Sequence, residues 1–571
     1  MQKKLINYLI FILIILNFTS CGRTDEKPII TEKKIEEKKT EEVIIKTAVF
    51  IDDIVSGLRY ENNGEVEFTN EKGEFNYTKG DIDFYIGNIK IGTISSIPDD
   101  NLVFIQDLLK LPRENTKDPK VLAIGTLLQS LDSNKSSNNI EIIKKDFDKF
   151  LYINKDIKDI NVSKVLADNN FTSLPRYKVV NHLEDTNNKY AFNQTEKDFL
   201  KDLFNIEYLW SDMVIEHNSS KFTNPMDMIN EFKYKELDKW SFSQTFSNYE
   251  SQSVQKSDGF GCEYYEDVIV NVVRGSPCQT SGLLRGDIVF LINDKNITYE
   301  SYMDAANNLG TESKFTVARP QNDLNNSYLP KEILITPNAY TYKVSQKDIF
   351  VDNQTNAKIG YFIYDQFTAL STDEIDKTFK YFKDNNISEL VIDLRYNGGG
   401  ELNTAAYLTS NIQNKYINST MFKLKHNNYF SYYNEIVNFF KVSNSIDISR
   451  VIFLTSPNTA SASELVINSL KPYMDVVLIG DKTHGKPVGM YGRNISNKFI
   501  YWLINFTLIN ANDEGYFYDG IDVDCQITEN INFQRYNVDD TLFNEALYYI
   551  KNNSCSNKNS NILPSNYTKL N

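Results

Sequence analysis

Apolar and polar residues alternate over four short stretches near the start of the chain. These stretches, residues 66–68, 75–77, 82–86 and 89–91, are bounded by glycines. Alternation with a period of two is typical of strands that bury one face, and the glycines fit tight turns. A helical pattern follows at residues 121–131. The pattern predicts a small antiparallel β-rich module with helices over residues 48–180, which we interpret as a spacer or docking domain.

The spacing of apolar residues then changes twice. Apolar positions three or four apart indicate helices at residues 199–210 and 225–232, which predicts a helical segment over residues 190–252. Strand-like runs return at residues 267–273 and 288–293, with glycine and proline at the turns between them. We therefore expect a separate β-rich domain over residues 256–338, and a multidomain α+β protein as a whole.

Three strand-like runs, residues 390–394, 451–455 and 475–480, occur in the last third of the chain. The second and third runs are separated by enough residues for a helix, and a helix that joins parallel strands brings the loops after them to one edge of the sheet. The pattern predicts an α/β core over residues 345–555, followed by a polar tail at residues 556–571.

Candidate catalytic residues follow these runs. Ser461 and Ser463 come where a helix is expected to begin, and Lys486 lies on a glycine-flanked turn after the third run. A serine hydroxyl is a poor nucleophile until a base removes its proton, and a lysine can be that base if burial keeps it neutral. The N–H groups at the start of a helix stabilise negative charge. These residue types indicate a serine–lysine hydrolase.

The segment Thr-Ala-Ser-Ala-Ser-Glu at residues 459–464, with Gly-Lys at residues 485–486, resembles the carboxy-terminal processing peptidases, also called tail-specific proteases. The family places the nucleophile at the first serine. The resemblance therefore implies Ser461 as nucleophile, Lys486 as general base and Ser463 as a residue of the helix turn. It also implies a protease core with the crotonase-like fold.

A glycine run at residues 397–400, Asn-Gly-Gly-Gly, resembles another segment of this family. The resemblance implies that a backbone N–H from Gly399 or Gly400 joins that of Ala462 to form an oxyanion hole. Each such donor typically stabilises the transition state by about 3 kcal/mol.

One position departs from the family pattern. Many members carry a glutamine four residues after the lysine, where it helps to orient the base, and this chain has Met490. Methionine cannot donate the orienting hydrogen bond. Another group then orients Lys486, or the site is a simple dyad, or activity has been lost. His484 is a candidate third member, although we interpret it as a turn residue beside the site.

Residues 256–338 resemble a PDZ domain, on the run Gly259-Phe260-Gly261 and the strands and turns after it. The resemblance implies that the amides of this run bind the terminal carboxylate of a peptide, while the peptide adds a strand to the sheet edge. Binding of a chain end suits a peptidase that recognises the C-terminal tails of its protein or peptide substrates.

The start of the chain predicts its location. Two lysines precede an apolar run at residues 5–16, which has the length of a signal-peptide core and is too short to span a membrane. Residues 18–22 resemble a lipobox, which implies removal of the signal peptide at residues 1–20 and lipid attachment to Cys21. The alternative is an ordinary secretory signal with a coincidental cysteine. Residues 21–47 read as a charged tether.

Composition excludes some functions and leaves others open. The net charge of −15 argues against nucleic-acid binding. The four histidines are far apart and lack a zinc motif, so we expect neither a metal nor a cofactor. Four cysteines remain beside Cys21, namely Cys262, Cys278, Cys525 and Cys555. Two local disulfides and four buried thiols are both compatible with their positions.

The sequence therefore predicts a serine endopeptidase of the bacterial cell envelope, anchored as an outer membrane lipoprotein on the periplasmic face or the cell surface. Its oligomeric state is not specified. The alternative is a catalytically inactive surface lipoprotein whose PDZ domain binds peptides, and Met490 is the residue that keeps this alternative open.

Overall fold

The computed structural model describes residues 44–134, 139–215, 217–321, 327–556 and 566–570. The predicted signal peptide, Cys21 and nearly all of the tether lie outside these ranges. The described residues from Lys46 onward form one folded unit. In the described ranges, no helix combines the length and the apolar character that crossing a membrane requires.

The β-rich module contains the four predicted strands and the predicted helix. It holds three sheets, in the orders β5-β1-β8, β10-β7-β6-β3-β4 and β2-β9, over a core that also includes α2. The expectation of antiparallel strands is only partly correct, because β1 pairs with β8, β7 with β10 and β2 with β9 in parallel. The elements are β1 (Lys46–Ile51), β2 (Val55–Ser56), β3 (Arg59–Asn62), β4 (Glu65–Phe68), β5 (Glu74–Tyr77), β6 (Ile82–Ile86), β7 (Ile89–Ile94), β8 (Leu102–Phe104), α1 (Ile105–Leu108), α2 (Pro119–Ser130), β9 (Ile140–Glu141), α3 (Lys144–Phe147), β10 (Lys155–Asp156), α4 (Val162–Asp168) and α5 (Arg176–Ala191).

The segment at residues 190–252 contains α6 (Gln194–Ile206), α7 (Pro225–Phe232) and α8 (Phe246–Ser253), but also a strand, β11 (Phe242–Thr245). β11 pairs antiparallel with β28 (Phe499–Asn510) of the core. The helical expectation misses β11 because a polar four-residue edge strand shows no apolar alternation. Helices α6 and α7 share one hydrophobic cluster with β27 (Val488–Arg493) and β28, so this segment is packed onto the core.

Residues 256–338 form a sheet in the order β13-β14-β15-β17-β18, with β16 paired to β15. We call this region the β13–β18 unit. A disulfide joins Cys262 to Cys278 in it, so the free-thiol alternative does not hold there. The strands β12 (Lys256–Ser257) and β19 (Tyr340–Thr341) pair with each other at its two ends. The other elements are β13 (Cys262–Tyr265), β14 (Val268–Val272), α9 (Pro277–Thr280), β15 (Ile288–Ile292), β16 (Lys295–Asn296), α10 (Tyr299–Ala306), β17 (Ser313–Pro320) and β18 (Tyr328–Ile335).

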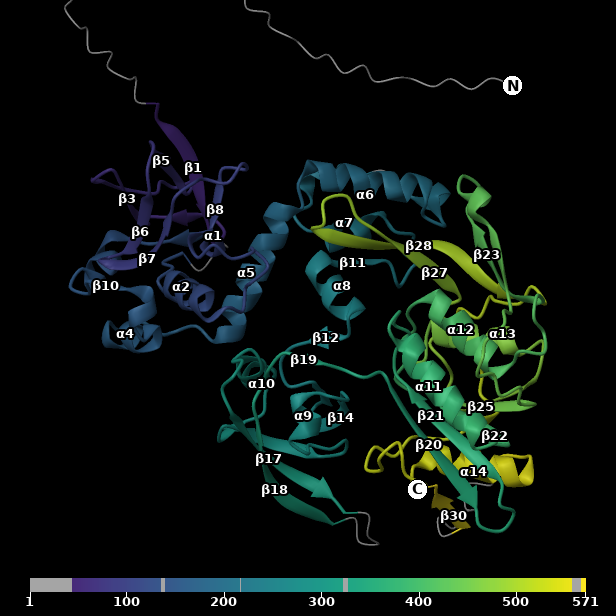
Figure 1. The fold of residues 1–571 in the computed structure, drawn as a ribbon. Coiled ribbons are helices and arrows are strands. Elements are labelled where there is room, and N and C mark those ends of the chain that lie inside the picture. The colour runs from purple at the N-terminus through teal and green to yellow at the C-terminus, as the bar shows by residue number, and fades with distance from the viewer. Residues whose placement is uncertain (1–43, 135–138, 216, 322–326, 557–565, 571) are drawn as a thin grey trace, which may run out of the picture. The chain divides into compact units, whose positions relative to one another are not determined.

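The core is a seven-stranded sheet in the order β29-β26-β25-β22-β21-β20-β30. Its pairs from β29 to β21 are parallel, including the pair of β25 and β26 that the sequence predicts. Helices α11, α12 and α13 cover one face and α14 covers the other (Figure 1). The elements are β20 (Ser345–Asp352), β21 (Lys358–Tyr364), α11 (Ser371–Asp384), β22 (Glu389–Asp393), α12 (Leu402–Ile412), β25 (Arg450–Thr455), α13 (Ala462–Leu470), β26 (Asp475–Gly480), β29 (Cys525–Gln526), α14 (Thr541–Asn552) and β30 (Tyr567–Lys569).

Successive strand residues alternate between the two faces of this sheet. In β25, Val451 and Phe453 pack under α11–α13, whereas Ile452 and Leu454 pack against α14. Both sets are fully buried, which explains why the sequence shows a continuous apolar run. A second sheet, β11-β28-β23-β24 with β27 beside β28, completes the core and adds β23 (Thr420–His426) and β24 (Glu435–Asn438).

The chain's last described residues also belong to the core. β30 pairs with β20, and Tyr567 is buried, although the sequence assigns residues 556–571 to a polar tail. A disulfide joins Cys525 to Cys555 just before this region. A three-residue edge strand carries too little apolar pattern to be recognised in advance.

A buried arginine lies directly after β22. Arg395 is fully buried and pairs with Asp393 at 2.7 Å, Asp540 at 2.8 Å and Glu529 at 2.7 Å. Burial alone would raise the pKa of Asp393, but the charges of Arg395 and Arg535 outweigh it and lower that pKa far below its ordinary value. This network fixes the chain where β22 leads into the glycine run.

Replacing Arg395 should therefore destabilise the core strongly. We expect Arg395→Met to cost about 3–5 kcal/mol, because three carboxylates lose their buried partner. The matched control is Lys380→Met, which breaks an exposed pair with Asp384 and should cost under about 1 kcal/mol. Urea unfolding followed by fluorescence measures both. Equal losses would mean that the network does not stabilise the core.

Candidate active site

The three candidate segments follow three neighbouring parallel strands. The glycine run follows β22, Ser461 follows β25, and Lys486 follows β26. β22 pairs with β25 and β25 with β26, all in parallel, so their carboxyl ends share one edge of the sheet. The segments that the sequence nominates are thus brought together by the order of the strands.

The carboxylate of Glu464 joins the serine and lysine loops. Its Oε2 accepts from the N–H of Ser461 at 2.9 Å and from the N–H of Lys486 at 2.8 Å. Its Oε1 accepts from Gly485 N–H at 2.7 Å and from Thr483 Oγ1 at 2.6 Å. The backbones of Ser461 and Lys486 therefore lie within two hydrogen-bond lengths of each other.

Glu464 is fully buried. Burial raises its pKa, and the donors around the carboxylate oppose that rise. None of the motifs in the sequence assigns this residue a role. A signal for it was present, since Ser461 and Glu464 have the serine–glutamate spacing of a helix capping box.

Ser461 has an unusual backbone, with φ of 56° and ψ of −115°. A residue other than glycine in such a conformation is strained by about 1–3 kcal/mol, and strain of this kind is common at active sites. The Ser461 side chain is only partly buried. Ser463 differs, because it is fully buried and its Oγ donates to the Asn397 carbonyl at 2.9 Å. The two serines thus have different environments, and Ser461 is the accessible one.

The glycine run lies against Ser461. A Cβ placed on Gly399 would come 2.8 Å from Ser461 Cβ and 2.9 Å from the Ala462 nitrogen, so only glycine fits. The Gly399 N–H donates to Asn397 Oδ1 at 2.9 Å. No acceptor for the N–H of Gly400 or of Ala462 occurs among the residues that the structure describes. Of the two predicted glycines, Gly400 is therefore the better candidate donor.

Lys486 has few polar neighbours at its amine. Its Nζ lies 3.9 Å from Met490 Sδ, so the departure from the family pattern is in direct contact with the candidate base. Burial lowers the pKa of Lys486 to about 8, against the opposing charges of Asp238 and then Glu464. A substantial fraction of this lysine is consequently neutral at mildly alkaline pH, as a general base requires.

His484 contacts the loop and the residues before β11. Its Nε2 accepts from Trp240 Nε1–H at 3.0 Å, and its Nδ1 lies 3.2 Å from the Pro457 carbonyl. An imidazole with a partner at each ring nitrogen has a fixed orientation. This geometry supports the interpretation of His484 as a turn residue.

The predicted peptide-binding run lies at an exposed strand. Gly259, Phe260 and Gly261 directly precede β13, an edge strand that pairs only with β14. Both glycines have positive φ, and Phe260 is buried against Tyr302 and Phe315. The N–H groups of Phe260 and Gly261 have no acceptor within the described part of the chain. Tyr302 Oη donates to the Cys262 carbonyl at 2.6 Å, so one backbone acceptor of β13 already has a hydrogen-bond partner.

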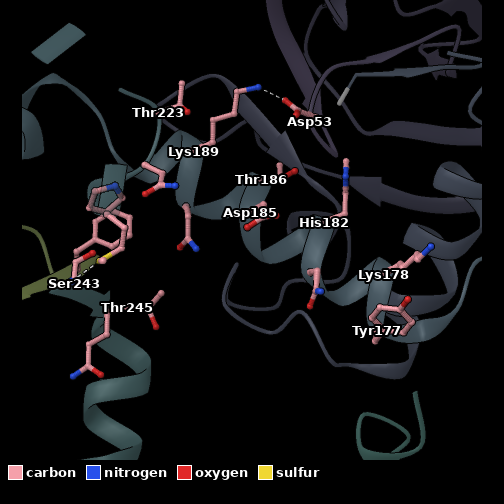
Figure 2. A pocket seen from close by; sticks show the side chains of 17 residues that line it. Asp53, Tyr177, Lys178, His182, Asp185, Thr186, Lys189, Thr223, Ser243 and Thr245 are labelled. Carbon is pink, nitrogen blue, oxygen red and sulfur yellow. Dashed lines mark hydrogen bonds and ion pairs between the residues drawn. The ribbon is translucent and has the colours of Figure 1, made fainter. Parts of the chain in front are cut away.

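A separate cavity of about 750 Å³ lies along α5 and is bordered by residues of α7 and β11. Figure 2 shows its polar lining, including the ion pair of Lys189 with Asp53. Burial would lower the pKa of His182, but its contacts with Asp52 outweigh burial and raise that pKa to about 9. None of the predicted site residues lines this cavity.

Comparison with known proteins assigns the core to a family. Residues 358–527 match the model of peptidase family S41. The chain carries a peptidase family S41 domain. The match includes Ser461, Glu464, Lys486 and the glycine run, so every candidate catalytic residue lies inside it.

Two sequence relatives and one solved structure agree with this assignment. A protein of Staphylococcus aureus named as a probable CtpA-like serine protease is 26% identical over 310 residues, which are 52% of this chain and 58% of the relative. A carboxy-terminal-processing protease of Bartonella bacilliformis is 26% identical over 38% of this chain and 48% of its own. This chain thus spans only about half the length of these relatives. The crystal structure of a protein assigned as an S41 protease, from Bacteroides fragilis, shares the fold with a TM-score of 0.57 and 23% identity, covering 62% of this chain and 97% of that one.

Removing the charge of Glu464 should loosen both loops. In Glu464→Gln, one carboxylate oxygen becomes an NH₂ group that cannot accept, so two of its four donors lose their acceptor. We expect amide hydrogen exchange to speed up about tenfold, equivalent to about one lost hydrogen bond, either at Ser461 and Lys486 or at Gly485, depending on which oxygen is replaced. Exchange measured by mass spectrometry tests this. Glu196→Gln, which alters another buried carboxylate, should leave these amides unchanged, and protection unaltered in Glu464→Gln would contradict the bridging role.

Proposed function

We propose that the protein is a serine endopeptidase in which Ser461 is the nucleophile and Lys486 the general base. The observation that carries this proposal is the Glu464 carboxylate, which accepts hydrogen bonds from the backbone N–H groups of both residues. The lowered pKa of Lys486, about 8, supports the same assignment. The family match supports peptidase chemistry at this site.

The proposed reaction is acyl transfer in two steps. Lys486 Nζ takes the proton from Ser461 Oγ, which attacks the scissile carbonyl, and the resulting oxyanion accepts from the N–H groups of Ala462 and Gly400. The proton then passes from Nζ to the leaving amine as the peptide bond breaks. A water molecule, deprotonated by Lys486, releases the acyl group and restores the serine.

We also propose that the β13–β18 unit is a PDZ domain that binds the C-terminal tails of substrates. The support is a pair of N–H groups without acceptors, at Phe260 and Gly261, next to the free edge of β13. A terminal carboxylate fits such amides, and an extended peptide fits the edge strand. The second candidate function, an inactive peptide-binding protein, is favoured only by Met490 beside Lys486.

The location remains part of the proposal: a lipoprotein of the cell envelope, attached through Cys21. The disulfides Cys262–Cys278 and Cys525–Cys555 support an oxidising compartment.

Substitution of the proposed dyad tests the activity. We expect Ser461→Ala and Lys486→Ala each to lower casein cleavage by at least about 1,000-fold, because each removes one half of a unit that acts together. Ser463→Ala is the matched control: its hydroxyl serves a backbone carbonyl, and the variant should keep most of the activity. Circular dichroism checks that each variant is folded. An inactive Ser463→Ala beside an active Ser461→Ala would reverse the assignment of the nucleophile.

Amidation of a peptide tests tail recognition. Peptides that end in an apolar residue should bind the full chain carrying Ser461→Ala, and their C-terminal amides should bind about tenfold more weakly, because charge-assisted hydrogen bonds to the carboxylate are lost. Calorimetry measures both affinities. Equal binding of the acid and amide forms would remove tail recognition from the proposed function.

A further inference from the structure

The amine of Lys486 lacks a strong partner at the position where the family pattern provides one. Met490 Sδ is 3.9 Å from Nζ, and a thioether is only a weak acceptor. Met490 therefore fills the space beside the amine without fixing its direction. A base that must face Ser461 needs an orienting group from elsewhere in the chain.

Residues 238–241, which precede β11, are hydrogen-bonded to the chain before Lys486 and to the strand partner of the chain after it. Before it, Trp240 Nε1–H donates to His484 Nε2 at 3.0 Å. After it, Ser241 Oγ accepts from the N–H of Ile504 at 3.1 Å, and Ile504 is the strand partner of Met490. Trp240 and Met490 also pack in one hydrophobic cluster. The segment that contains Asp238 is thus held alongside the loop that contains Lys486.

Asp238 carries a buried negative charge that only neutral groups contact. The residue is 1% exposed. Its Oδ1 accepts from the N–H groups of Trp240 and Ser241, at 3.0 and 2.8 Å, and its Oδ2 accepts from Tyr208 Oη at 2.8 Å. None of the ion pairs found among the described residues includes Asp238. Its charge is therefore available to act on a nearby cation.

The other titratable groups around Lys486 favour its ammonium form less than Asp238 does. Asp238 acts more strongly on the pKa of Lys486 than Glu464 does, although burial outweighs both. Glu464 already binds four donors of the two loops. Both ring nitrogens of His484 are already in contact with Trp240 and Pro457, and burial raises the pKa of Tyr208, which keeps its hydroxyl protonated.

We propose that Asp238 is the positioning residue for Lys486: it orients the amine toward Ser461 and stabilises the ammonium that forms when the serine proton moves to Nζ. Asp238 touches neither substrate nor the reacting atoms, and it gains no proton in the step. Its role resembles that of an aspartate that holds a catalytic histidine. The inference rests on the proposed peptidase function, with Lys486 as base.

The first test is the pH dependence of cleavage by the full chain. A lysine base must be neutral, so activity should rise with pH, with a midpoint near 8. Asp238→Asn keeps an acceptor for the two backbone N–H groups but removes the negative charge that favours the ammonium. The midpoint should therefore fall by about one pH unit, and the plateau rate should fall about tenfold.

The matched control is Glu196→Gln. Glu196 lies in α6, is as buried as Asp238 and accepts from Tyr501 Oη at 2.6 Å, but it is not among the groups that act on the pKa of Lys486. This variant should leave the midpoint in place. A midpoint in Asp238→Asn that equals that of the wild type would overturn the proposal.

A second measurement does not depend on activity. The ε-carbon of ¹³C-labelled Lys486 can be titrated by NMR in Ser461→Ala, with and without Asp238→Asn. We expect the lysine midpoint to fall by about one unit when Asp238 is replaced. If the wild type cleaves nothing, the proposed function fails, yet this titration still decides whether Asp238 acts on Lys486.

Tyr208→Phe serves if Asp238→Asn does not fold. This variant removes the hydroxyl that donates to Asp238 and keeps the ring in its cluster. The carboxylate then loses a group that offsets its charge, so the Lys486 midpoint should rise. An unchanged midpoint in a folded Tyr208→Phe would overturn the proposal.

Discussion

The site depends on one buried carboxylate. Glu464 lies in the first turn of α13, and its four hydrogen bonds fix the positions of the serine and lysine loops relative to each other. A buried donor without an acceptor costs about 1–3 kcal/mol. The hydrogen bonds to Glu464 therefore offset the backbone strain of Ser461, which would be relieved if they were lost. The sheet brings the two loops to the same edge, and Glu464 sets the distance between them. Positioning at this scale decides whether a base can reach a nucleophile.

A second electrostatic network lies where the loop with the glycine run begins. Arg395 neutralises Asp393 and Asp540, and Arg535 pairs with both Asp393 and Asp365. Two arginines of the β13–β18 unit, Arg274 and Arg285, extend this network through Asp365 and Glu529. The loop that presents Gly400 therefore begins at a charged cluster to which two parts of the chain contribute. A change in either part alters the electrostatic environment of that loop.

Much of this arrangement could be predicted from the sequence, because it follows from local patterns. Strand-like runs with a helix between them predict neighbouring parallel strands, and the strand order then brings Ser461, Lys486 and the glycine run to one edge. Asp238 could not be predicted in this way. It reaches the site through tertiary packing of a distant segment, and an aspartate before a short polar strand has no distinctive spacing. β11 and β30 were missed for a related reason, since short edge strands have little apolar pattern.

The paired strands β12 and β19 determine how the β13–β18 unit is mechanically connected. The chain enters the unit through β12 and leaves through β19, and the two strands are hydrogen-bonded to each other. The bond from Tyr342 N–H to the Gln255 carbonyl, at 2.8 Å, lengthens this ladder by one step. A force applied to the unit would thus act on the paired strands β12 and β19 together, instead of on a single linker. Rotation of the unit would have to break these hydrogen bonds together with the ion pairs of Arg274 with Asp365 and of Arg285 with Glu529, so the connection is a restrained one.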